Sequence, residues 1–179
     1  MTEHPDTPDV DPYLRSAARE IEAHAAGAGW DQPARLFALV PTSDLLSREP
    51  GLASALGVTD ADAGALTPVE QETPADHPLE ETLEGIMWPA EVFGCAAVVE
   101  RLVLPPSADA EMPEDHEAAQ EYAASHPDRQ EVRIVAAATR DGAAYCTLRM
   151  RAHDDDQSVL EGVDLVPGLL ELLHGTLTQ

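Results

Sequence analysis

The side chains best suited to catalysis or metal binding lie in residues 148–162, LRMRAHDDDQSVLEG. Of these, His153, Asp154 and Asp156 could bind a divalent metal ion or act as base and acid in a hydrolytic reaction. Successive residues of an extended chain point to opposite sides, so of the three consecutive aspartates only Asp154 and Asp156 could share one ion. Two carboxylates without a further ligand make a weak site, and the sequence favours a solvated loop that balances nearby arginines.

Arginines form the second candidate, because five of the ten basic residues lie between residues 129 and 151. Arg133, Arg149 and Arg151 fall on one face of a predicted hairpin, which we expect to face water or a partner. They could bind an acidic peptide, a carboxylate or a phosphorylated ligand. The alternative, which the sequence favours, is pairing with acids of the same chain such as Glu131, since cross-strand ion pairs are common.

The charge composition excludes several classes of function. All ten basic residues are arginine, and the formal net charge is -24. Without lysine the chain cannot form a Schiff base or hold pyridoxal phosphate covalently, and it contains no phosphate-binding G-x-x-x-x-G-K-[ST] loop. Because a surface this acidic repels phosphate backbones and anionic lipids, we expect no nucleic-acid or membrane partner. We predict no cofactor and no catalytic residue.

Two further observations concern the cysteines and the cellular location. Cys95 and Cys146 stand far apart in apolar runs, which predicts buried small side chains rather than a disulfide or a metal site. The first 13 residues are acidic and proline-rich, unlike a secretory signal, and no apolar run approaches the roughly 20 residues of a membrane helix. We therefore expect a cytoplasmic protein.

The elements that must position these residues follow from hydrophobic periodicity and turn residues. Residues 1–10 are predicted to be a disordered acidic tail, and residues 11–179 a single α+β domain. A helix is expected from Pro12 to Gly27, and a second, polar and rich in alanine, over residues 114–126. Short helical insertions are expected near residues 43–56 and 79–86. Strands are predicted at residues 34–40, at 65–72 on an edge because of Pro68, and at 91–106 in the centre of the sheet.

Residues 130–152 form the clearest hairpin pattern in the chain. A three-residue loop around Gly142 aligns Ile134 with Leu148 and Ala136 with Cys146, which places the apolar side chains on one face. We therefore predict a type I turn followed by a bulge, with Gly142 left-handed. The final helix, from Pro167, carries more leucine than one contact face uses. It either packs deep across the sheet or is shared with a second copy of the chain.

These elements predict a single, mainly antiparallel, five-stranded sheet flanked by helices, in the order α-β-β-β-α-β-β-α with short helical insertions. Three parts of the chain, RLFALVPTSDLLSREPGLASALG, LTPVEQE with WPAEVFGCAAVVERLVLPP, and HPDRQEVRIVAAATRDGAAYCTLRMRAHDDD with DLVPGLL, together resemble a family of uncharacterised cytoplasmic proteins of actinobacteria. The element order is also similar to that of type III secretion chaperones, acidic dimers that bind other polypeptides. That likeness concerns topology and implies no activity.

The function best supported by the sequence is a non-enzymatic, acidic binding module, homodimeric, that binds a protein or peptide. The alternatives are a metal-dependent enzyme that uses His153, Asp154 and Asp156, or a binder of small anions that uses the hairpin arginines.

Overall fold

A computed structural model describes residues 10–57, 64–73, 77–104 and 106–178. The predicted tail therefore lies outside the described residues except for Val10, which is exposed.

The described strands form one antiparallel sheet of six strands in the spatial order β2-β1-β3-β4-β5-β6. The class is α+β, but the prediction of five strands is wrong. The additional strand, β6 (Leu160–Gly162), pairs with β5 (Ala144–Met150). It contains three residues and follows the acidic segment of the chain, so it offers no alternating pattern long enough to predict.

The remaining strands lie where the sequence predicts them. They are β1 (Arg35–Pro41), β2 (Leu66–Gln71), β3 (Gly94–Val103) and β4 (Gln130–Thr139). β3 lies between β1 and β4, and β2 is the first strand of the sheet, so both the central and the edge prediction are confirmed. The position of Pro68 on an edge strand agrees with its missing N–H group, which an inner strand would need for pairing.

The β4–β5 hairpin has the predicted register. Ile134 lies opposite Leu148 and Ala136 opposite Cys146, and Gly142 has a φ of 87°, in the left-handed region. The agreement follows from the strand period of two, because a slip of one residue would move every apolar side chain to the other face.

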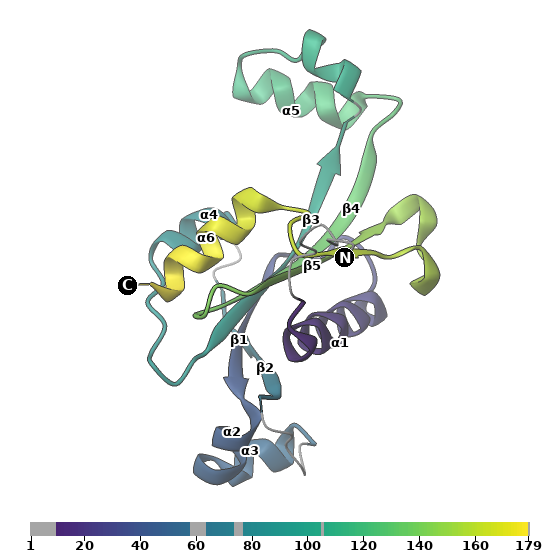
Figure 1. The fold of residues 1–179 in the computed structure, drawn as a ribbon. Helices are drawn as coiled ribbons and strands as arrows, with labels where there is room; N and C mark the ends of the chain where they lie inside the picture. The colour runs from purple at the N-terminus through teal and green to yellow at the C-terminus, as the bar shows by residue number, and fades with distance from the viewer. Residues whose placement is uncertain (1–9, 58–63, 74–76, 105, 179) are drawn as a thin grey trace, which may run out of the picture.

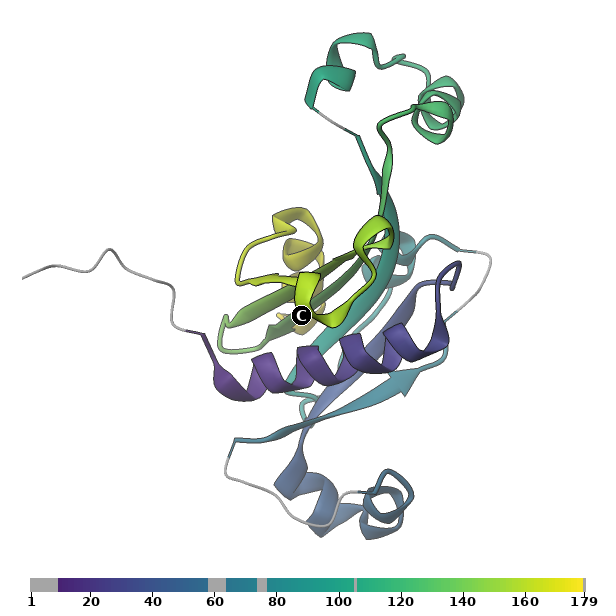
Figure 2. The same ribbon diagram turned by 90° about the vertical axis from the view of Figure 1, so that its right-hand side faces the viewer.

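Helices cover both faces of this sheet (Figures 1 and 2). The first helix, α1 (Pro12–Ala28), is capped by the carboxylate of Asp11 and buries Leu14, Ala18 and Ile21 against one face. The other face is covered by α4 (Leu79–Glu84) and α6 (Pro167–Leu177). Because both faces are covered, polar side chains on the α1 side of the sheet are also enclosed.

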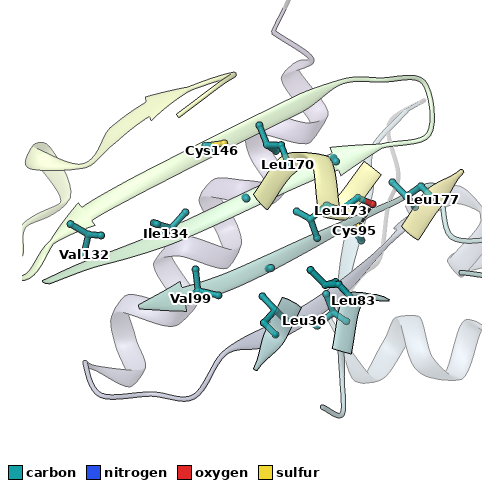
Figure 3. Close-up of a cluster of buried hydrophobic side chains, with 14 residues drawn as sticks. Leu36, Leu83, Cys95, Val99, Val132, Ile134, Cys146, Leu170, Leu173 and Leu177 are labelled. Carbon is teal, nitrogen blue, oxygen red and sulfur yellow. Dashed lines mark hydrogen bonds between the residues drawn. The ribbon is translucent and has the colours of Figure 1, made fainter. Parts of the chain in front are cut away.

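The leucines of α6 pack across the sheet, as Figure 3 shows. Leu170, Leu173 and Leu177 are buried beside Cys95 of β3. This agrees with the first of the two interpretations of the leucine-rich helix. Leu169 and Leu172 are only half-buried and lie nearer the solvent.

Helical insertions extend beyond the sheet at its two ends (Figure 1). Helices α2 (Thr42–Arg48) and α3 (Pro50–Ala55) follow β1 at one end. At the other end β3 and β4 form a long arm that carries the 3₁₀ helix η1 (Pro106–Glu111) and α5 (His116–Ser125). No residue of α5 is buried.

Candidate functional site

In the segment of residues 148–162, Arg149 pairs with Glu22 of α1 and with two aspartates of the segment itself. The Arg149 side chain, only 4 % exposed, donates to Glu22 Oε1 at 2.8 and 2.5 Å. It also donates to Asp154 at 3.0 Å and to Asp156 at 2.7 Å. Burial alone would lower the pKa of this guanidinium, but the hydrogen bonds to Glu22 and Asp156 raise the pKa above its ordinary value. Arg149 is therefore a permanent cation neutralised by acids of its own chain.

Trp30 also binds this segment, although Asp154 and Asp156 stay exposed. Its indole Nε1–H donates to Asp154 Oδ2 at 3.0 Å, and its ring lies 4.4 Å from the guanidinium carbon of Arg133. The hydrogen bond from Trp30, assisted by Arg149, lowers the pKa of the Asp154 carboxyl. Arg151 lies over the same ring at 5.6 Å and pairs with Asp31 at 2.9 Å.

The hairpin arginines do not form the water-facing surface that the sequence predicts. Arg133 and Arg149 are both buried, because α1 and the turn after it cover this face of the sheet. Arg151 is exposed, and it also pairs with Glu131 at 3.1 Å, the acid that the sequence indicated. A strand face with polar residues is expected to face water, and here its burial is compensated by the Glu22 carboxylate for Arg149 and by the Gly29 carbonyl and the Trp30 ring for Arg133.

The three candidate metal ligands do not converge. Asp154 and Asp156 both bond to one guanidinium, which competes with a cation for the same oxygens. His153 is exposed at the end of the 3₁₀ helix η2 (Arg151–His153). In the part of the chain that the structure describes, no group of three or more histidines, cysteines or acids is arranged to hold a metal ion.

A groove lies on the opposite face of the sheet, beside α6; we call it the α6 groove. Its volume is about 410 Å³, within the range of ligand sites in proteins. The floor is formed by Val99 of β3 and Ile134 of β4, and apolar side chains of α6 and the residues before it form one wall. The lining residues are Glu80, Val99, Arg101, Ile134, Val166, Gly168, Leu169 and Leu172. Arg101 and Glu80 form an ion pair at its margin.

A second hollow, the Trp88 pocket, lies over β1 and β2 and has a volume of about 260 Å³. Its floor is apolar, and its walls are α2, α3 and the loop of residues 88–92. The lining residues are Ala38, Val40, Asp44, Leu45, Arg48, Glu49, Leu52, Val69, Gln71, Trp88, Pro89, Glu91 and Val92.

Arg140 fixes the loop that forms one wall of the Trp88 pocket. Its guanidinium donates to the backbone carbonyls of Trp88, Pro89 and Val92, and to that of Leu177 at the end of α6. Trp88 Nε1–H also donates to Thr176 of α6 at 3.0 Å. In the sequence Arg140 is one of the five arginines between residues 129 and 151, and Trp88 was not predicted to be a functional residue. The presence of only two tryptophans in the chain was the available signal.

Both cysteines are free thiols and completely buried, as predicted. Burial raises the pKa of Cys95 to about 11 and also raises that of Cys146, so both thiols are protonated at neutral pH.

None of the described helices combines the length and the hydrophobicity needed to cross a lipid bilayer.

Comparison with known proteins agrees with the resemblance in sequence at the level of the family. No curated protein matches the chain, and neither does any solved structure. A profile of the PPA1309-like protein family matches residues 14–178, which include every helix and strand described above except the first two residues of α1. The chain therefore belongs to the PPA1309-like protein family.

Proposed function

We propose that this protein is a non-enzymatic binding module that takes an apolar segment of another polypeptide into the α6 groove. The observation that carries the proposal is the groove itself, an apolar hollow of about 410 Å³ on the sheet face beside the last helix. Apolar hollows of this size with few polar groups are typical binding sites. Leu169 and Leu172 stand half-buried at its wall, so a bound side chain would complete their removal from water.

The polar side of the molecule supports a different role for the arginines. Arg149 and Arg151 are paired with acids of the chain, and Arg133 is stacked on Trp30 and bonded to the carbonyl of Gly29. These arginines therefore hold the end of α1 and the aspartates of residues 154–156 against the sheet. A small anion would have to break the ion pairs of Arg149 and Arg151 before it could bind to these two residues, which argues against the anion-binding alternative there.

A helix with leucines on one side and cations on the other is the partner that fits these surfaces best. Grooves between helices commonly accept the apolar face of an amphipathic helix through side chains spaced three or four residues apart. The net charge of -24 attracts a basic partner at long range and increases the rate of encounter.

A second copy of the chain is the alternative occupant of the same groove. If two copies associate, the contact would involve Leu169 and Leu172, because Leu173 is completely buried in the core. We favour a different polypeptide, since two surfaces of -24 repel each other. As part of the same proposal, we place the protein in the cytoplasm of actinobacteria and compare its mode of binding with that of type III secretion chaperones.

The test uses a synthetic amphipathic helix of leucine and lysine, about 18 residues long so that it can be helical when bound. Isothermal titration is expected to show binding to the wild type and at least about tenfold weaker binding to Leu169→Asp, because a carboxylate in the groove would be desolvated. Leu56→Asp is the matched control, since Leu56 is exposed and lines neither hollow. Equal weakening by both variants would overturn the proposal. A dimer that resists excess peptide in light scattering would also overturn it.

A further inference from the structure

The Trp88 pocket lies on the same face of the sheet as the α6 groove. Ala38 of its floor lies opposite Cys95 of β3 and Val69 of β2. Cys95 belongs to the core beneath α6, so the pocket and the groove both open away from α1. One polypeptide bound to this face could contact both hollows.

The chemistry of the Trp88 pocket differs from that of the groove. Its floor is apolar, formed by Ala38, Val40 and Val69, with the Trp88 indole at the side. Four charged side chains line it: Asp44, Arg48, Glu49 and Glu91. The structure records no hydrogen bond or ion pair for these four side chains within the described part of the chain.

We propose that the Trp88 pocket receives a lysine side chain of the same bound polypeptide, an inference that rests on the proposed function. A lysine has an apolar stem that can lie on the floor and a cation that can reach the acids at the rim. An indole beside the stem adds a favourable contact with the ammonium group. The three acids exceed the single arginine by two charges, so the rim favours a cation.

The pocket is built to keep its shape without a ligand. Arg140 holds the carbonyls of Trp88, Pro89 and Val92 in one fork, and Trp88 is fixed to α6 through Thr176. A wall held in this way loses little conformational freedom when a ligand binds. Because the wall is bonded to α6, the distance between the pocket and the groove is fixed. The two hollows can therefore select a partner by the spacing of its side chains.

The occupant is another protein rather than a second copy of this chain. The chain contains no lysine, and its 34 acids outnumber its ten arginines. A second copy would therefore bring acids to an acidic rim. A basic amphipathic segment, with leucines for the groove and a lysine for the Trp88 pocket, satisfies both hollows.

The experiment follows NMR signals of the full-length protein during titration with the leucine–lysine peptide. The Trp88 indole N–H and the methyl groups of Val40 and Val69 are expected to shift together with those of Leu169 and Leu172. The same peptide with every lysine replaced by glutamine, which has neither the cation nor the long apolar stem, is expected to shift only the groove signals. If the groove signals stay unchanged, the proposed function fails. If they shift while the Trp88 signals do not, only this inference fails.

Variants of the rim provide an independent readout. Asp44→Asn combined with Glu91→Gln is expected to raise the peptide Kd about threefold to tenfold, as the loss of partly exposed ion pairs predicts. The matched control, Glu20→Gln with Glu84→Gln, removes the same charge at exposed positions outside both hollows and is expected to change Kd by less than about twofold. Equal effects of the two double variants would overturn the inference. Shifts at Trp88 that depend on protein concentration without peptide would do the same, because they would place a second copy in the pocket.

Discussion

Removal of the Arg149 guanidinium tests whether its ion pairs with Glu22, Asp154 and Asp156 stabilise the fold. In Arg149→Met the Glu22 carboxylate, with a side chain 7 % exposed, stays buried and loses the one cation that pairs with it among the described residues. Breaking a buried ion pair by removing one partner costs about 3–5 kcal/mol. For a chain of 179 residues this corresponds to a fall in Tm of roughly 10 °C. Urea denaturation monitored by circular dichroism measures the free energy of unfolding directly.

Two further variants make the interpretation specific. The double variant Glu22→Met with Arg149→Met removes both buried charges and is expected to recover about 2 kcal/mol or more, because a buried pair contributes little beyond an apolar replacement. Arg19→Met is the matched control: Arg19 bonds Glu161 at 2.6 Å, but its side chain is 50 % exposed, so the loss of stability is expected to be much smaller than that of Arg149→Met. The reasoning is refuted if Arg149→Met costs no more than Arg19→Met, or if the two single losses simply add in the double variant.

Three other predictions follow from the same contacts. Millimolar Mg²⁺, Mn²⁺, Zn²⁺ or Ca²⁺ is expected to leave the Tm unchanged, because Asp154 and Asp156 are bonded to Arg149; a rise that Asp154→Ala abolishes would instead show a metal site. Cys95 and Cys146 are expected to react with a thiol reagent only after unfolding, as both are completely buried, and fast labelling of the native protein at pH 8 would contradict this. Arg19 lowers the pKa of Glu161, and Trp30 with Arg149 lowers that of Asp154. The two carboxylates therefore stabilise the folded state above the ordinary carboxylate pKa of about 4, and this contribution is lost as the pH falls through the lowered pKa values. The stability difference between wild type and Asp154→Asn with Glu161→Gln should therefore be constant from pH 7 to about 5 and shrink below about pH 4, and a difference that grows on acidification would be inconsistent with it.

Much of the sheet could be predicted because its signals are local. The register of Ile134 against Leu148 follows from alternation on both sides of a glycine turn, and Pro68 restricts its strand to an edge. β6 could not be predicted, because three residues cannot show a period and its pairing depends on β5 being in place. The sixth strand is a consequence of the tertiary fold.

The candidate site was harder to predict for a physical reason. Arg133 and Arg149 alternate with apolar residues, which in sequence looks like a strand with one wet face. Their burial depends on Glu22 and Trp30, more than 100 residues earlier in the chain, and no spacing rule joins such distant positions. The α6 groove and the Trp88 pocket likewise combine residues from separate elements, so they exist only in the folded molecule.

The most direct test of the central claim is to locate the bound peptide on the protein. With a spin label on the leucine–lysine peptide, methyl signals of Val99, Ile134 and Leu169 are expected to broaden, while those of Ile21 on the α1 face keep their intensity. Broadening on the α1 face, or none at a peptide concentration that saturates binding, would contradict the account.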